Sequence, residues 1–189
     1  MFNNISERIA DNLIENGTIS SEDKSTYQLG IKQGFTIGLN ILSSLVIAFI
    51  FRMIIETFLF LAVYIPLRKF GGGIHAKTPI RCYIYSNLMI VAILLVIRFF
   101  PLGNLICNII SIISSIPIFI FAPVDTPKRR LDDIEKKVFK KRTIIILVSE
   151  LLVQLALSFI LDENIIMTFS LAFISVSAVM IIGLIKKSE

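Results

Sequence analysis

The apolar residues of this chain are gathered into long runs rather than spread at the spacing of a soluble core. Apolar stretches cover residues 35–67, 83–100, 102–122, 143–161 and 165–185. A helix needs about 20 apolar residues to cross a hydrocarbon layer of about 30 Å. Four of the stretches have about this length, whereas 35–67 is long enough for two short spans with a turn near Arg52. The pattern predicts an all-α integral membrane protein with about six transmembrane helices.

Short polar interruptions mark where these helices should end. Pro101, Gly103 and Asn104 separate the third and fourth predicted spans, and a proline followed by turn residues is typical of a helix end. Arg52 and Glu56 interrupt the first stretch, where two short spans meet. Because both spans are short, a hairpin that only partly enters the bilayer is an alternative for residues 35–67.

Residues 1–34 are polar and precede the first apolar stretch, so no cleavable signal peptide is expected. Within them Phe2, Ile5, Ile9 and Leu13 recur at helical spacing, which predicts an amphipathic helix over residues 1–16. Two positions for its apolar side are equally compatible with the sequence. It rests on the membrane surface, or it packs on the protein's own loops.

Composition supports the membrane class and argues against several others. Of the 189 residues, 55% are hydrophobic and 17% are charged, whereas about a quarter of the residues in soluble domains are charged. The net charge of +5 comes from basic residues beside apolar runs, where lipid headgroups are nearer anions than nucleic acid. One histidine and two distant cysteines make neither a metal site nor a disulfide framework. We expect membrane lipids as partners, no nucleic acid, and no metal or other cofactor.

Lysine and arginine are concentrated in alternate loops, which predicts the orientation of the chain. One set of loops holds nearly all of them, within residues 1–34, 68–82, 123–142 and 186–187. The other set holds Arg52, Arg98 and the acidic pair Asp162 and Glu163. Because basic loops remain in the cytoplasm, both termini and the loops at 68–82 and 123–142 should be cytoplasmic. We therefore expect a single membrane-embedded domain over residues 1–189, a multi-pass protein of the cell membrane.

The segment between the second and third spans combines three glycines with the only histidine and a cysteine. Glycine loses the most conformational freedom on folding, so Gly71, Gly72 and Gly73 indicate a positive φ or a close backbone approach. A flexible linker is the alternative. The helices predicted on both sides, and His75 just after the glycines, favour an ordered loop.

His75 and Cys82 form a candidate catalytic pair. On one continuous helix they would sit about 10 Å apart, too far for a hydrogen bond. Thr78 and Pro79 are a favoured N-cap and first helical residue, so the third span should begin there, with His75 in the preceding loop. Cys82 then lies in the first turn, where the helix dipole and Arg81 favour a thiolate and His75 can act as base. Taken singly, a histidine facing headgroups and a small buried cysteine are the alternatives.

Two further groups lie inside predicted spans. Cys107 is surrounded by apolar residues and is predicted to be structural. Glu150 is an ionisable group in a membrane helix and should have a partner, for which Gln154, Arg68 and Arg81 are candidates. Catalytic support and helix-to-helix contact both remain open as its role.

The region 123–142 is strongly basic and includes Lys128, Arg129 and Arg130. A lipid-facing cytoplasmic loop of this composition follows from the orientation rule alone. The more specific alternative is a surface that docks an acidic peptide segment or an anionic C-terminus.

The order of these motifs resembles the accessory gene regulator protein B family, membrane endopeptidases that process quorum-sensing propeptides in Gram-positive bacteria. The resemblance covers essentially the whole chain. It is carried by Arg68, Gly73, the pair His75 and Ala76, Cys82, Ser86, the run Phe121-Ala122-Pro123, Pro127 and the basic residues that follow. Gly71, Gly72 and the pair Arg129 and Arg130 lie where members vary, which concerns substrate specificity rather than class.

The resemblance implies a cysteine endopeptidase that cuts a short membrane-associated propeptide on its C-terminal side. His75 would be the general base and Cys82 the nucleophile, while Arg68 and Gly73 would shape the site. Ser86 and the basic residues Lys128, Arg129 and Arg130 are further candidates for shaping the site or binding substrate. A cysteine or serine of the substrate would attack the acyl-enzyme and release a cyclic thiolactone or lactone peptide. A homodimer is a further expectation.

The alternative from another class is a membrane protein without catalysis, such as a transporter or export subunit for a small peptide. Transporters concentrate polar and unwound elements at the membrane midplane within repeats. In this chain the polar elements lie at one predicted surface and no inverted repeat is evident. The sequence therefore favours the enzyme.

Overall fold

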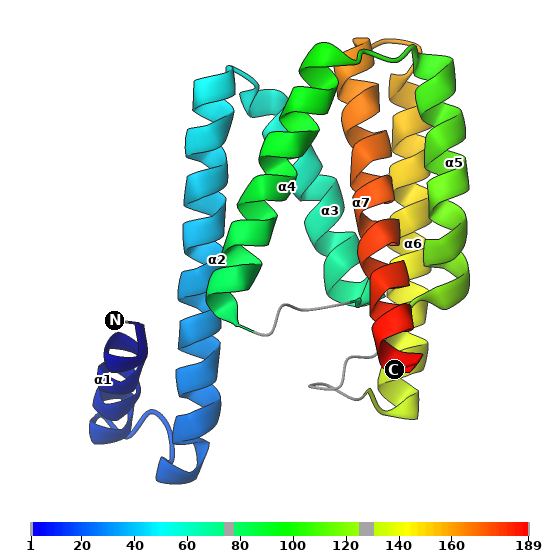
Figure 1. Ribbon diagram of the computed structural model, residues 1–189. Coiled ribbons are helices and arrows are strands. Elements are labelled where there is room, and N and C mark those ends of the chain that lie inside the picture. The colour runs from blue at the N-terminus through cyan, green and yellow to red at the C-terminus, as the bar shows by residue number, and fades with distance from the viewer. Residues whose placement is uncertain (1, 74–77, 125–130, 189) are drawn as a thin grey trace.

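The computed structural model describes residues 2–73, 78–124 and 131–188, and helices account for nearly all of them. Seven α-helices and one short 3-10 helix follow one another along the described chain (Figure 1). They are α1 (Phe2–Glu15), η1 (Ser21–Asp23), α2 (Lys24–Phe51), α3 (Ile54–Gly71), α4 (Pro79–Phe99), α5 (Asn104–Phe121), α6 (Asp133–Leu157) and α7 (Glu163–Ser188). The predicted all-α class is confirmed for these residues.

The predicted turn in the first apolar stretch lies between α2 and α3. Arg52 has a φ of 57°, in the left-handed region, and its N–H donates to carbonyl groups in the last turn of α2. The N–H of Met53 donates to the carbonyl oxygen of Ala48 at 2.9 Å. Residues 35–67 therefore belong to a helical hairpin rather than to one long helix.

The predicted amphipathic helix is α1, which packs against the beginning of α2 (Figure 1). Its small residues Ser6 and Ala10 are fully buried. Lys24 at the start of α2 forms an ion pair with Asp11, with 2.5 Å between Nζ and Oδ1. Both charged groups are partly exposed, so the pair contributes little and the buried face does most to hold α1.

The packed core surrounds α7, which contacts α3 and α5 most extensively (Figure 1). Phe173 and Val176 of α7 are fully buried. Ser170 of the same helix donates to the carbonyl oxygen of Cys107 at 2.8 Å and accepts from Ser111 at 2.9 Å. Lipid supplies no hydrophobic force between membrane helices, so their association depends on close packing and on hydrogen bonds between them. Small residues and hydroxyl groups allow both.

Among the described residues, four helical segments are long and apolar enough to cross a membrane, by length and composition. They are Ser21–Phe51, Ile80–Phe99, Asn104–Phe121 and Glu163–Ile185. The outer faces of α2 and α5 carry exposed large apolar side chains, including Phe49, Leu105 and Ile113. Such surfaces are stable in lipid and not in water, so the chain is a membrane protein.

Two predicted segments differ in their boundaries. The N-terminal segment 1–34 already contains the first residues of α2, and the basic segment 123–142 contains the start of α6 at Asp133. Asp132 caps α6 by a capping box with Glu135. Helices continue beyond the apolar residues because backbone hydrogen bonds also form in water, whereas hydropathy reports only the part that lies in lipid. The basic residues from Lys136 to Arg142 are therefore helical rather than in a loop.

Candidate active site around Cys82

The structure places Cys82 in the first turns of α4. Thr78 is the N-cap, with extended backbone at φ −128° and ψ 150°, and its hydroxyl accepts from the N–H of Arg81 at 3.4 Å. Pro79 is the first helical residue, and the N–H of Cys82 donates to the carbonyl oxygen of Thr78 at 3.1 Å. The predicted helix start is confirmed. Cys82 is half-buried at the positive end of the helix dipole.

The glycine segment at the end of α3 is held against a distant part of the chain. Gly72 forms a parallel bridge with Val124, 52 positions further on. The N–H of Val124 donates to the carbonyl oxygen of Gly71 at 2.9 Å, and the N–H of Gly73 donates to that of Val124 at 3.3 Å. Backbone hydrogen bonds at both sides make this an ordered turn, which argues against a flexible linker at Gly72 and Gly73.

Only two of the three glycines are required by the geometry. Gly72 has a φ of 76°, and a side chain there would collide with the carbonyl oxygen of Val124. Gly73 has a φ of 106°, and a Cβ atom would lie 2.9 Å from Nη1 of Arg68 and 3.1 Å from the carbonyl oxygen of Val179. At Gly71 a Cβ atom would meet only ordinary contacts. Positive φ and close approach therefore confine Gly72 and Gly73 to glycine.

Arg68 connects α3 to the glycine turn. It is half-buried in the last turn of the helix, and its Nη1 donates to the carbonyl oxygen of Gly72. The same Nη1 would lie 2.9 Å from a Cβ atom on Gly73, so Arg68 and Gly73, which the sequence analysis placed in one site, are neighbours. A guanidinium is suited to this position because it is always charged and presents five N–H donors.

The sequence analysis overlooked Tyr64, which lies one turn before Arg68 on α3. Its ring is half-buried and stacks on Phe60, with centroids 5.3 Å apart. The signal available in the sequence was the spacing of four residues between Tyr64 and Arg68, which puts both on one side of a helix.

The remaining predicted site residues divide between the described and the other parts of the chain. Ser86 follows Cys82 by one turn of α4, is half-buried, and shares a face with it. His75, Lys128, Arg129 and Arg130 lie outside the described residues. The geometry of the predicted His75 and Cys82 pair is thus not described.

Basic residues gather beside the glycine turn. The Phe70 ring, next to Gly71, has Lys69 Nζ at 5.6 Å and the Arg142 guanidinium carbon at 5.3 Å from its centroid. Phe139 of α6 packs on the same ring, with centroids 5.7 Å apart. These cation–π contacts join the end of α3 to the basic start of α6.

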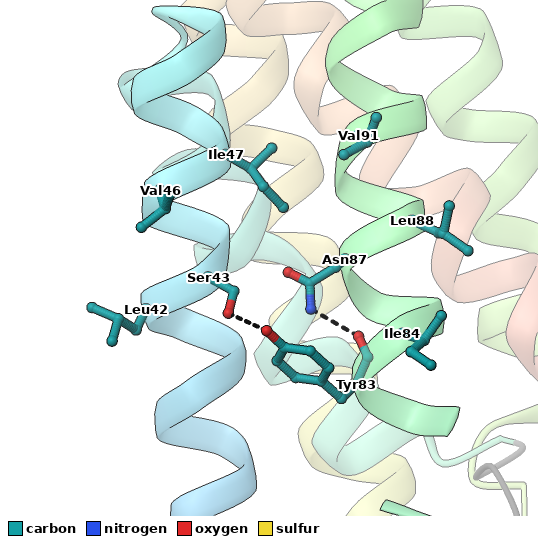
Figure 2. A pocket seen from close by; sticks show the side chains of 9 residues that line it. All are labelled: Leu42, Ser43, Val46, Ile47, Tyr83, Ile84, Asn87, Leu88 and Val91. Atoms are coloured by element: carbon teal, nitrogen blue, oxygen red, sulfur yellow. Dashed lines mark hydrogen bonds between the residues drawn. The ribbon is translucent and has the colours of Figure 1, made fainter. Parts of the chain in front are cut away.

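Two hollows on the described surface are lined by residues other than Cys82. An open groove of about 530 Å³ separates α2 from α4, and Figure 2 shows Tyr83 reaching across it to Ser43, with 2.6 Å between the hydroxyl oxygens. Asn87 donates to the carbonyl oxygen of Tyr83 at 2.8 Å (Figure 2). Cys82 is not among the residues that line this groove. A second hollow of about 670 Å³ lies at the other end of α4, beside Arg52 and Arg98.

Glu150 is half-buried on α6, and its Oε2 atom has no hydrogen-bond partner among the described residues. The predicted partner Gln154 turns elsewhere, since its Nε2 donates to Asn108 at 3.0 Å. Arg68 is instead engaged with Gly72. The hydrogen bonds of Gln154 join α6 to α5 and α7, and they test neither role predicted for Glu150.

Comparison with known proteins decides the family. Residues 6–184 match the sequence model named Accessory gene regulator B. This chain belongs to the accessory gene regulator B family. The match extends from α1 to α7 and so includes every described residue of the site.

Two relatives from Clostridium perfringens are similar along most of their length. The AgrB-like protein 2 of strain 13 / Type A is 29% identical over 172 residues, which cover 87% of this chain and 80% of the relative. The AgrB-like protein of strain SM101 / Type A is 27% identical over the same shares. No solved structure matches. Family membership connects the chain with the accessory gene regulator system of quorum sensing.

Proposed function

We propose that this chain is a membrane cysteine endopeptidase that cleaves the propeptide of a quorum-sensing autoinducing peptide. The observation that carries the proposal is the position of Cys82 at the start of α4, the helix that follows the glycine turn bonded by Arg68, in a family member. A half-buried cysteine at a helix N-terminus combines access with stabilisation of the thiolate. His75, seven residues earlier, is the proposed base.

The reaction has two steps at one carbonyl carbon. His75 accepts the proton of the Cys82 thiol, and the sulfur attacks the carbonyl carbon of the scissile peptide bond. The C–N bond breaks, the amine of the C-terminal fragment takes the proton from His75, and a thioester to Cys82 remains. A thiol or hydroxyl inside the same propeptide then attacks the thioester, transfers its proton to the Cys82 sulfur, and closes a thiolactone or lactone ring.

A membrane site favours ring closure over hydrolysis. The second nucleophile is tethered to the acyl group, so its effective concentration far exceeds that of an external thiol. Water would compete unless it were kept from the thioester, which the lipid-facing helices around α4 assist. An amide is more stable than a thioester, so removal of the C-terminal fragment pulls the reaction forward.

The proposed topology has six spans, α2 to α7, with both termini and the active site in the cytoplasm. α3 and α6 carry charges, but α3 has them near its ends, at Glu56, Arg68 and Lys69. Its 18 residues give a length of about 27 Å, close to the hydrocarbon thickness. Neighbouring helices supply partners for the charges that lipid does not.

Impermeant thiol labelling tests this topology in a background without Cys82 and Cys107. Cysteines placed at Lys137 should react only after the cells are permeabilised, whereas cysteines at Asp162 should react in intact cells. Labelling of position 137 from outside would reverse the orientation. Equal labelling of both positions in intact cells would contradict an intact six-span arrangement.

The proposed partner is the propeptide, with its acidic segment docked on the basic region that includes Lys128, Arg129 and Arg130. The cation–π cluster around Phe70 supports this, because it concentrates Lys69 and Arg142 next to the glycine turn. Charge attraction of this kind positions a substrate and raises its rate of encounter.

Trapping the acyl-enzyme tests the function. The purified protein in lipid nanodiscs is mixed with a propeptide whose internal cysteine and serine nucleophiles are changed to alanine, and the products are analysed by intact mass spectrometry. A thioester on Cys82 that hydroxylamine removes is the expected result. Export of an uncleaved peptide by the Cys82→Ala variant in proteoliposomes, without any adduct on the parent protein, would favour the transporter instead.

A further inference from the structure

The hollow at the far end of α4 brings together the two basic residues that the sequence places outside the predicted cytoplasmic loops. Arg52, in the turn after α2, and Arg98, in the last turn of α4, both line it. Glu56 from the first turn of α3 and Asn164 from the start of α7 line the same space. Four helix ends thus contribute two cations, a carboxylate and an amide to one hollow of about 670 Å³.

The charged side chains of this hollow have no partner of their own. Within the part of the chain that the structure describes, the side chains of Arg52, Glu56 and Arg98 form no ion pair and no hydrogen bond. The carboxylate of Glu163 does not line the hollow, and its Oε1 lies 3.9 Å from the position of a Cβ atom on Gly103. Two arginines beside one carboxylate leave an excess of one positive charge in the lining.

The start of α3 adds to the positive potential. Its N-cap is Met53, which lines the hollow and accepts no side-chain hydrogen bond from the first N–H groups of the helix. Free N–H groups and the helix dipole favour an anion at such an end. A guanidinium presents parallel N–H donors that match the oxygens of a phosphate. The hollow is therefore suited to a phosphate group held between Arg52 and Arg98.

The surroundings of the hollow are those of a lipid headgroup. Large apolar side chains close to the two arginines in the chain are exposed, namely Ile50, Ile54, Phe99 and Phe100. Arg98 follows Cys82 by 16 positions on α4, a rise of about 24 Å, so the hollow and the candidate nucleophile lie at opposite ends of one span (Figure 1). The ends of membrane spans lie at the level of the headgroups. A ligand with a phosphate and apolar chains fits this combination.

We propose that this hollow binds the headgroup of one phospholipid, with its phosphate between Arg52 and Arg98. Glu56 accepts a hydrogen bond from an N–H or O–H donor of the headgroup next to the phosphate, and the acyl chains lie along the exposed apolar side chains. In the proposed orientation this lipid belongs to the outer leaflet. Bound there, it joins the hairpin of α2 and α3 to the ends of α4 and α7. The inference requires membrane-spanning helices but not the proposed peptidase activity.

Native mass spectrometry of the detergent-solubilised protein, titrated with short-chain phosphatidylethanolamine, tests the site. Arg52→Gln with Arg98→Gln should weaken the tightest lipid binding roughly tenfold or more, because charge-assisted hydrogen bonds to the phosphate are lost. Lys140→Gln with Lys141→Gln is the matched control, since it removes the same charge from exposed positions on α6, and it should stay within about threefold. Arg98→Gln alone keeps the turn at Arg52 intact and should still lose affinity several-fold. Equal losses in the two double variants, or no loss in Arg98→Gln, would overturn the inference.

Three further probes identify what the hollow recognises. Diacylglycerol of the same chain length lacks the phosphate and should bind roughly tenfold more weakly, whereas equal binding would mean that the acyl chains alone are held. Millimolar inorganic phosphate should leave the lipid bound, and displacement by it would make a free anion the ligand. Phosphatidylcholine carries methyl groups in place of the N–H donors, so it should bind several-fold more weakly to the parent and equally well to Glu56→Ala. Equal affinity of the parent for both phospholipids would overturn the headgroup class.

Discussion

The two cysteines of this protein occupy the same position in two different helices. Cys82 is the fourth residue of α4, and its N–H donates to the carbonyl oxygen of the N-cap Thr78 at 3.1 Å. Cys107 is the fourth residue of α5, and its N–H donates to the carbonyl oxygen of the N-cap Gly103, also at 3.1 Å. α4 and α5 run in opposite directions, so the two thiols lie at opposite ends of the bundle (Figure 1).

The two cysteines share the same position in a helix, but the residues around them differ. Cys107 is fully buried, and its Sγ lies 3.5 Å from the carbonyl oxygen of Leu102. The hydroxyl of Ser170 donates a hydrogen bond to the carbonyl oxygen of Cys107. Cys82 is half-buried. The helix dipole acts on both thiols and cannot by itself select a nucleophile. Access, together with the ordered turn beside Arg68, distinguishes Cys82.

The largest effect is expected from exchanging each thiol. Cys82→Ala should abolish propeptide cleavage, because a methyl group cannot form the thioester, while membrane insertion is retained. Cys107→Ala should keep activity within a few-fold, since it removes one sulfur atom from a packed site. Cleavage assays on both variants at equal expression provide the measurement. An inactive Cys107→Ala with an active Cys82→Ala would assign the chemistry to the other end of the bundle.

The glycines near the two cysteines give the next largest contrast. Gly73→Ala should lower kcat/KM by roughly 10- to 100-fold, because a side chain at positive φ and against Arg68 costs about 1–3 kcal/mol. Gly103→Ala is the matched control. Gly103 has a φ of −62°, and a Cβ atom there would lie 3.9 Å from its nearest neighbour. A Gly73→Ala variant as active as Gly103→Ala would show that the turn need not keep this shape.

Alkylation rates compare the two thiols without any substrate. In the folded protein, a maleimide should modify Cys82 roughly tenfold or more faster than Cys107, since reactivity follows access and thiolate character. Peptide mapping by mass spectrometry after short exposures gives both rates in one sample. Denaturation in detergent should bring the two rates together. Equal rates before denaturation would mean that the burial of Cys107 does not protect it.

The smallest effect is expected at the cap of α4. Thr78→Ala removes the side-chain acceptor for the Arg81 N–H, a long contact at 3.4 Å, so a cost near about 0.5 kcal/mol and roughly a twofold lower cleavage rate are expected. Thr78→Ser, which keeps the hydroxyl, should match the parent. A tenfold loss in Thr78→Ala that Thr78→Ser restores would show that the cap positions Cys82 more strongly than its bond length indicates.

Local signals in the sequence predicted the helix ends well. Thr78 and Pro79 at the start of α4, and Arg52 at the turn after α2, were identified from neighbours within a few residues. Capping, proline geometry and span length act over one or two helical turns, so they can be read from the chain directly. The helices α2 and α6 begin before the apolar stretches at 35–67 and 143–161, because hydropathy does not report helix that extends into water.

The sequence by itself determined a helical membrane protein with Cys82 in the first turn of a helix, since these features depend on composition and near neighbours. Only the tertiary structure decided that Val124 pairs with Gly72 and that Arg68 bonds to this turn. Gly72 follows α3 and Val124 follows α5, so the packing of distant parts of the chain sets the distance between them. Two cysteines at the same position of their helices therefore differ in accessibility because of the residues that pack around them.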